Sequence, residues 1–129
     1  IKGLVLKNLN KKKIIYDKSK ILILGISYKK NIDDLRESSS LKLIKLLNKS
    51  GIKSISVSDP YIKSNYIKTR DFKSKIKNIK LTSNNISKFD IVILMTDHDK
   101  FNYKTIKNNS KFIIDCRGKF NISDKIIRG

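Results

Sequence analysis

The sequence of 129 residues contains one cysteine, one histidine, one proline and five glycines, and it has no tryptophan and no alanine. Because Cys116 is the only cysteine, no disulfide can form within the chain, which fits a reducing compartment such as the cytoplasm. One cysteine and one histidine, His98, do not make a zinc site. No proline- or glycine-rich stretch divides the chain, and its length suits one domain with a sizeable core.

Long apolar runs are absent as well. None approaches the roughly 20 residues that a helix needs to cross a bilayer, and no signal-peptide pattern is present. We therefore expect a soluble, cytoplasmic protein that makes no membrane contact. The chain begins with Ile1 instead of Met, and its first residues read as the tail of a basic amphipathic helix, which indicates a piece of a longer protein.

Arginine is scarce in a chain whose net charge is +19. Only four of the 30 basic residues are arginines, namely Arg36, Arg70, Arg117 and Arg128. Lysine, isoleucine and asparagine are abundant and share A/T-rich codons, so we interpret much of the charge as a composition bias spread over a solvated surface. Arginine is the preferred residue for contacts to bases and phosphates. Without it, and without a recognisable motif, we do not expect nucleic-acid binding.

Apolar runs alternate along the chain with segments of helical period. The pattern predicts strands at 21–26, 54–60, 79–83, 90–97 and 111–117, and helices at 39–49, around 66–72, at 84–88 and at 101–108. Ser38 or Ser39 is expected to cap the helix at 39–49, and Gly51 to follow its end. Strands separated by helices imply right-handed crossovers. The predicted fold is α/β, a Rossmann-like doubly wound, mainly parallel sheet with flanking helices.

The loop after the first predicted strand carries an aromatic residue and both signs of charge: Tyr28, Lys29, Asp34 and Arg36. Ligands of open α/β sheets bind outside the carboxyl ends of the strands, so this loop is well placed to bind one. Gly25 alone does not make a dinucleotide fingerprint, because the further glycine positions hold Ser27 and Lys30. We therefore do not expect this domain to hold NAD in the standard way by itself.

The segment 25–38 resembles the hallmark loop of the UDP-glucose/GDP-mannose dehydrogenase family, whose C-terminal domain carries a pattern close to GxxYKxxxxDxRES. Seven positions are in register with it: Gly25, Tyr28, Lys29, Asp34, Arg36, Glu37 and Ser38. Asp59-Pro60, the run beginning Thr96-Asp97-His98, and Asp115-Cys116-Arg117 follow in the order typical of the family. The resemblance implies that 1–18 is the end of an inter-domain linking helix and that 19–129 is the C-terminal UDP-sugar-binding domain.

The resemblance also assigns roles to individual side chains. Tyr28, Lys29 and Arg117 match residues that contact the UDP-sugar, and Arg36 matches an arginine that reaches toward NAD. Two alternatives stay open. Arg117 can instead pair with Asp115 or Asp97, and the acidic residues near Arg36, namely Asp33, Asp34 and Glu37, can serve to stiffen the loop and cap the helix.

The single histidine and the single cysteine are not expected to be catalytic. The run TDHDKFNY at 96–103 is similar to that of family members that oxidise UDP-N-acetylhexosamines, but a lone His with acidic neighbours is more often a hydrogen-bonded loop residue. The family's cysteine nucleophile lies upstream in a motif that this chain lacks, and Cys116 lies on a predicted buried strand. We therefore expect neither catalytic residues nor a metal site here.

The resemblance implies an NAD-dependent UDP-sugar 6-dehydrogenase that converts a UDP-N-acetylhexosamine to the uronic acid for polysaccharide biosynthesis. NAD would be bound mainly by an N-terminal domain of the same chain, and the full-length enzyme would be a homo-oligomer. The 129 residues alone would be inactive. The alternative is a non-catalytic Rossmann-like module that binds a nucleotide or a partner protein.

Overall fold

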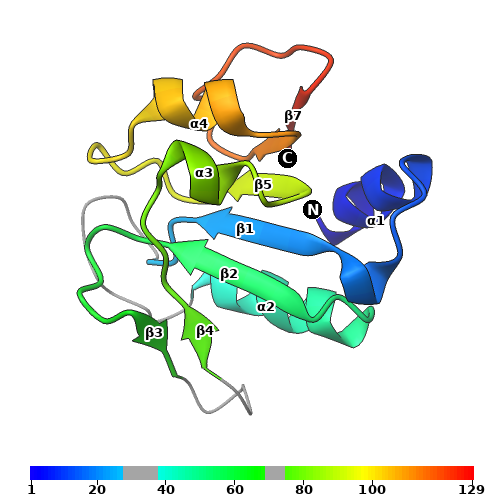
Figure 1. The fold of residues 1–129 in the computed structure, drawn as a ribbon, viewed down its shortest axis with the longest axis horizontal. Helices are drawn as coiled ribbons and strands as arrows, with labels where there is room; N and C mark the ends of the chain where they lie inside the picture. The colour runs from blue at the N-terminus through cyan, green and yellow to red at the C-terminus, as the bar shows by residue number, and fades with distance from the viewer. Residues whose placement is uncertain (28–37, 69–74) are drawn as a thin grey trace.

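The computed structural model describes residues 1–27, 38–68 and 75–129 (Figure 1). Its centre is a five-stranded sheet in the order β2-β1-β5-β6-β7, and every neighbouring pair of strands is parallel. The strands are β1 (Lys20–Leu24), β2 (Ser54–Ser58), β5 (Ile91–Leu94), β6 (Ile113–Asp115) and β7 (Ile126–Arg128). The predicted Rossmann-like α/β fold is confirmed.

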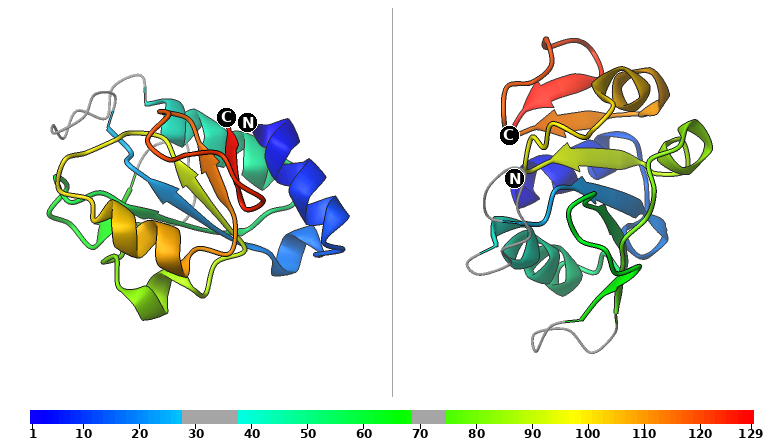
Figure 2. Two further views of the ribbon diagram at one scale, coloured as in Figure 1. Left: turned by 90° about the horizontal axis from the view of Figure 1, so that it is seen from above. Right: turned by 90° about the vertical axis from the view of Figure 1, so that its left-hand side faces the viewer.

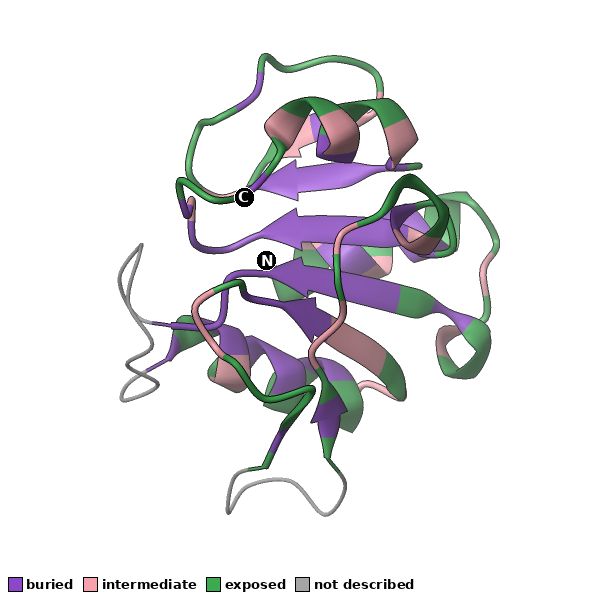
Figure 3. Ribbon diagram, turned by 60° about the vertical axis from the view of Figure 1, so that its left-hand side comes forward, coloured by how far each residue is buried: buried purple, intermediate pink, exposed green. Residues whose placement is uncertain are grey.

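Helices cover both faces of this sheet (Figure 2). On one face lie α1 (Lys2–Lys11) and α2 (Ser39–Lys49), and on the other lie α3 (Ser83–Ile86) and α4 (Tyr103–Asn109). Side chains of β1 alternate between the two cores, with Ile21 and Ile23 facing α1 and α2, and Leu22 and Leu24 facing α3 and α4. A strand buried on both faces reads as a continuous apolar run, which is why β1 and β5 were predictable (Figure 3).

The helix predicted at 39–49 is present with the predicted ends. Ser38 is the N-cap, and its hydroxyl oxygen accepts a hydrogen bond from the Leu41 backbone N–H at 3.2 Å. Gly51 follows the C-cap with φ of +99°, a conformation that suits glycine. Leu46 of this helix is 46% exposed although it is apolar.

Between β2 and β5 the structure differs from the prediction. In place of a helix at the start of 66–72, Tyr66–Ile67 forms strand β3, which pairs antiparallel with β4 (Ile76–Lys77); residues 69–74 lie outside the described residues. The strand predicted at 79–83 is not formed. Ile79 and Leu81 pack on the core, which explains why apolar and polar residues alternate in this segment as they would in a strand. The segment instead leads into α3, whose N-cap is Thr82.

The two ends of the chain pack against the sheet. Strand β7 was not predicted, since it has only three residues and only Ile126 is buried. At the other end, Val5 and Leu9 of α1 are fully buried in the core shared with α2. The predicted boundary between a linking helix at 1–18 and a binding domain at 19–129 stays a prediction. Within the described ranges, no helix has the length and apolar character needed to span a membrane.

Candidate functional site

Buried polar side chains gather at the carboxyl edge of the sheet. Eight of the eleven in the described ranges lie at or just past the strand ends or at the start of α2: Ser27, Ser38, Ser40, Ser58, Asp59, Thr96, His98 and Asp115. Buried polar groups need hydrogen-bond partners to offset the loss of water. Because they are concentrated at one edge, their hydrogen bonds hold the loops that follow the strands there.

Gly25 ends β1 in close contact with the segment after β5. Its φ is +84°, and a Cβ atom at this position would lie 2.4 Å from the Thr96 Cβ atom and 2.8 Å from the Thr96 carbonyl oxygen. Both the backbone conformation and the space therefore require glycine. Gly25 is therefore needed for the close packing of the chain against Thr96.

We call residues 25–27 the β1 stem, because they lead from β1 into the motif loop. Asp59, which follows β2, accepts hydrogen bonds at Oδ2 from the backbone N–H groups of Ile26 at 2.9 Å and Ser27 at 3.4 Å. Thr96, which follows β5, donates from its hydroxyl to the Ser27 carbonyl at 2.9 Å. Side chains from the strands on either side thus hold the stem in place.

The first turn of α2 holds the other side of the stem. The Ser38 hydroxyl donates to the Ile26 carbonyl, and the Ser40 hydroxyl donates to the Gly25 carbonyl at 2.7 Å. The Gly25 N–H donates to the Ser58 carbonyl at 2.9 Å. All six backbone N–H and C=O groups of the stem therefore have a partner, which is the accounting expected of buried backbone.

Asp59 and His98 form a fully buried pair across the end of β1. His98 Nε2 lies 2.9 Å from Asp59 Oδ2 and 3.3 Å from the Ser27 hydroxyl, and neither member of the pair exposes its side chain. Burial acts to raise the pKa of Asp59, but the hydrogen bonds from His98 and from the Ile26 and Tyr61 N–H groups outweigh it and lower that pKa. The prediction that His98 is a hydrogen-bonded loop residue is confirmed.

Asp115 organises the turn that carries Arg117. The Asp115 carboxylate is fully buried and accepts from the backbone N–H groups of Arg117, Gly118 and Phe120 at 2.8–2.9 Å. Its ionic partner is Arg128 of β7, at 3.0 Å. Arg117 instead directs its Nε to the Met95 carbonyl at 2.8 Å.

Among the described residues, the Arg117 guanidinium therefore has no acidic partner. Within the described part of the chain, neither Asp115 nor Asp97 forms an ion pair with it, so the alternative pairing raised by the sequence does not occur there. Its two terminal nitrogens have no hydrogen-bond partner among these residues. Arg117 thus keeps donors for a ligand.

Arg117 and the β1 stem share one cavity of about 240 Å³. The lining residues are Ser27, Ser39, Ser40, Met95, Thr96 and Arg117. Arg117 and Ser27 meet here because each follows a parallel strand at the same edge of the sheet. Tyr28, Lys29 and Arg36 lie outside the described residues, so their placement at this cavity stays a prediction.

The chemistry of this lining favours binding an anion. The N-terminus of α2 brings backbone N–H groups and the positive end of a helix dipole to the cavity, and Arg117 adds a charged fork suited to phosphate or carboxylate oxygens. None of the six lining residues is a carboxylate, histidine or cysteine. The described lining supplies one positive charge and several hydroxyl groups, which can orient a substrate.

Cys116 stands one residue past β6 and is half-buried, instead of lying on the buried strand predicted for it. Burial, with a smaller contribution from the neighbouring Asp115 carboxylate, raises the pKa of the thiol. A thiol that stays protonated is a poor nucleophile. In the described ranges, no group of three acidic, histidine or cysteine side chains is arranged to hold a metal ion.

Sequence reasoning did not find the Asp59–His98 pair or the support that Arg128 and Asp115 give to Arg117. A signal was present, because Asp59, His98 and Arg117 all stand just past strand ends, where side chains of a parallel sheet converge. Recognising the pair required the strand order, since β1 lies between β2 and β5.

Comparison with known proteins fits this geometry. The sequence profile of the UDP-glucose/GDP-mannose dehydrogenase family, UDP binding domain, matches residues 22–122. The chain belongs to this family. It is 32% identical over 101 residues to an NDP-N-acetyl-D-galactosaminuronic acid dehydrogenase from Ralstonia solanacearum and 37% identical over 98 residues to a UDP-N-acetyl-D-mannosamine dehydrogenase from Methanococcus maripaludis. Each match covers 76% of this chain.

A solved structure agrees as well. The UDP-N-acetyl-D-mannosamine dehydrogenase of Pyrococcus horikoshii superposes with a TM-score of 0.70 and 25% identity over 94% of this chain. The chain spans only 20–27% of the length of these relatives. The comparisons therefore concern the UDP-binding domain of the family.

Proposed function

We propose that the chain is the UDP-sugar-binding part of an NAD-dependent nucleotide-sugar 6-dehydrogenase that oxidises a UDP-N-acetylhexosamine. The observation that supports this proposal is the cavity shared by Arg117 and the β1 stem, because it combines a guanidinium that has no acidic partner among the described residues with a helix N-terminus in a domain of this family. The names of the relatives, which include N-acetylgalactosaminuronic acid and N-acetylmannosamine dehydrogenases, support the choice of hexosamine.

In this proposal the domain binds and orients the substrate. Arg117 contacts the sugar nucleotide, and Tyr28 and Lys29 add a ring and a positive charge from the loop that the stem supports. Binding energy from the non-reacting end of the substrate would fix the sugar against the catalytic groups of the N-terminal part of the longer protein. The single Cys116 and the lining of the cavity give no reason to place chemistry here.

The residues of this domain do not fit a standard NAD site. Dinucleotide folds use several glycines after the first strand and an acidic residue at the end of the second strand to bind the ribose. Here Gly25 is the one glycine in the loop, and Asp59 is occupied by His98 and backbone N–H groups. We therefore assign NAD mainly to the N-terminal domain, with Arg36 reaching toward it.

The product, a UDP-N-acetylhexosaminuronic acid, suits polysaccharide biosynthesis in the cytoplasm, and we propose that the full-length enzyme is a homo-oligomer. A chain with one cysteine and no possible internal disulfide fits that compartment.

The test is a titration of the 129-residue chain with UDP-N-acetylglucosamine, in which backbone amide NMR signals report binding. Amides of Ser27, Ser40, Thr96 and Arg117 should shift, and Arg117→Ala should weaken binding about tenfold or more, the cost of losing a charge-assisted contact. Lys111→Ala, which removes one exposed positive charge before β6, is the control and should bind normally. Equal losses in both variants would mean that Arg117 acts only through net charge.

Activity provides the second test. The longer protein should reduce NAD in the presence of a UDP-N-acetylhexosamine, whereas the 129-residue chain alone should not. NADH formation by the chain alone would overturn the division of labour. A longer protein that binds UDP-sugars but never reduces NAD would support a non-catalytic binding module instead.

A further inference from the structure

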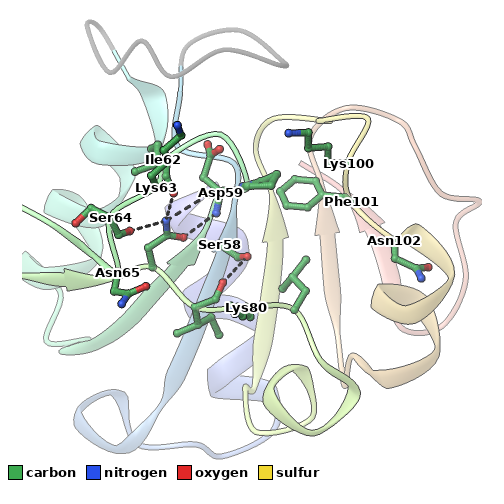
Figure 4. Close-up of a pocket in the computed structure, with 14 residues that line it drawn as sticks. Ser58, Asp59, Ile62, Lys63, Ser64, Asn65, Lys80, Lys100, Phe101 and Asn102 are labelled. Carbon is green, nitrogen blue, oxygen red and sulfur yellow. Dashed lines mark hydrogen bonds between the residues drawn. The ribbon is translucent and has the colours of Figure 1, made fainter.

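A second and larger cavity, of about 430 Å³, lies beside β2 on the face of the sheet that carries α3 and α4 (Figure 4). It differs from the Arg117 cavity in every lining residue. Three chain segments form it: the loop after β2 at 58–65, the segment 78–81 before α3, and 100–102 before α4. Its volume falls within the range of about 300–1,000 Å³ that small-molecule sites occupy.

Two side chains, Asn78 and Ser58, fix the wall of this cavity. Asn78 donates from Nδ2 to the carbonyls of Ile62 and Ser64 at 3.0 Å each, and its Oδ1 accepts from the Asp59 N–H at 2.9 Å. The Ser58 hydroxyl adds a bond to the Ile79 carbonyl at 2.7 Å. These contacts fix the backbone on both sides of Lys63, so the cavity is formed before any ligand arrives.

The lining of this cavity carries more positive than negative charge. Lys63, Lys80 and Lys100 are exposed and form no ion pair with any described residue, and Lys100 Nζ lies 4.6 Å from the centre of the Tyr61 ring, a cation–π contact that restrains it. Asp59 is the one acidic lining residue, but it is 2% exposed and its carboxylate is turned to His98 and backbone N–H groups.

The remaining lining is apolar and amide. Figure 4 shows Lys63 and Lys100 on opposite sides of the opening with Phe101 next to Lys100. Ile79, Leu81 and Phe101 supply an apolar wall. Asn102 caps α4 with its Oδ1, which leaves its amide N–H groups as donors.

We propose that this cavity binds a nucleoside phosphate, separately from the UDP-sugar proposed for the Arg117 cavity. The phosphate would lie between the ammonium groups of Lys63 and Lys100, and the base and ribose would rest on the wall formed by Ile79, Leu81 and Phe101. An inorganic anion would contact only the two ammonium groups, and an uncharged nucleoside would contact only the apolar wall. The combination predicts that both halves of the ligand contribute.

The 129-residue chain is titrated separately with AMP, inorganic phosphate and adenosine at constant ionic strength, and amide NMR signals report binding. AMP should bind saturably, with a Kd below about 1 mM, and should shift the amides of Lys63, Ile79 and Lys100. It should bind at least about tenfold more tightly than phosphate or adenosine. The double variant Lys63→Ala/Lys100→Ala should weaken AMP binding about tenfold or more, because two charged contacts are lost.

The matched control is Lys45→Ala/Lys53→Ala, which removes the same charge from exposed positions outside the cavity and should bind AMP normally. An equal loss in the control would reduce the effect to net charge and overturn the proposal. So would the absence of AMP binding, AMP affinity no better than that of phosphate, or shifts confined to Ser40, Thr96 and Arg117. The spectra of the variants show directly whether they remain folded.

Discussion

Asp59→Asn tests the most buried polar interaction of the candidate site. The wild-type carboxylate accepts hydrogen bonds on both oxygens, from Ile26 and Ser27 at Oδ2 and from Tyr61 at Oδ1, and it holds His98 at 2.9 Å. An asparagine of the same shape has one accepting oxygen. In either orientation its NH₂ group faces a backbone N–H group, so at least one buried donor loses its partner.

The expected loss follows from these contacts. An unsatisfied buried donor costs about 1–3 kcal/mol, and a charge-assisted hydrogen bond contributes about 1.5–3 kcal/mol. We expect Asp59→Asn to lower the free energy of unfolding by about 3–5 kcal/mol, the sum of these two losses. That is a large part of the 5–15 kcal/mol that typically separates folded and unfolded domains. Asp124→Asn, at an exposed position, should change it by less than about 0.5 kcal/mol.

The measurement is urea unfolding of wild type, Asp59→Asn and His98→Asn, and of the double variant. The single losses should not add, because each removes the same contact, and the coupling should exceed about 1 kcal/mol. A loss below about 1 kcal/mol for Asp59→Asn, with an unchanged denaturant slope, would refute the role of the pair.

The difference in free energy of unfolding between wild type and Asp59→Asn should depend on pH in one direction. The folded pKa of Asp59 is lowered from its ordinary value of 3.8, so its ionisation stabilises the fold fully above that ordinary value. The stabilisation is lost as the pH falls through the lower folded pKa. The gap between wild type and Asp59→Asn should therefore narrow below about pH 4. A gap that widens on acidification would contradict this.

Three further predictions concern single residues. Gly25→Ala should destabilise the chain by about 2–5 kcal/mol in urea unfolding, because alanine disfavours positive φ and its Cβ would overlap Thr96; a neutral effect would disprove the close approach. In the longer enzyme, Lys29→Ala should raise KM for the UDP-sugar more than for NAD, and Arg36→Ala the reverse, whereas equal changes would point to loop folding. Cys116→Ser should leave kcat largely unchanged at an unchanged melting temperature, and a fall of several orders of magnitude would make Cys116 the nucleophile.

The parts of the fold that could be predicted are those with local signals. Strands β1 and β5 are apolar runs buried on both faces, and α2 combines helical periodicity with a Ser38 cap and a Gly51 end. Strands β3, β4 and β7 have two or three residues each, and they exist through pairing with distant segments. A pattern read along the sequence does not contain that pairing.

The same distinction applies to the site. Arg117 was predictable because it follows a strong strand and matches a family motif, and its cavity with Ser27 follows from the parallel sheet. The pairing of Asp59 with His98 spans 39 positions and depends on β2 and β5 standing on either side of β1. Each residue alone reads as an ordinary loop residue, and only the strand order brings the two together.

In the proposed site, the β1 stem supports the loop that follows it, whereas Arg117 contacts the ligand. Its six backbone polar groups are all satisfied within the domain, by Asp59, Thr96 and the serines at the start of α2 among others. The motif loop that follows therefore starts from a fixed position whether or not a substrate is bound. Substitutions in the stem or at Asp59 should then lower stability before they change affinity. Substitutions at Arg117, whose terminal nitrogens form no hydrogen bond with the described residues, should change affinity with little loss of stability. A site organised in this way is preorganised, since the cost of ordering its frame is met in folding and not in binding.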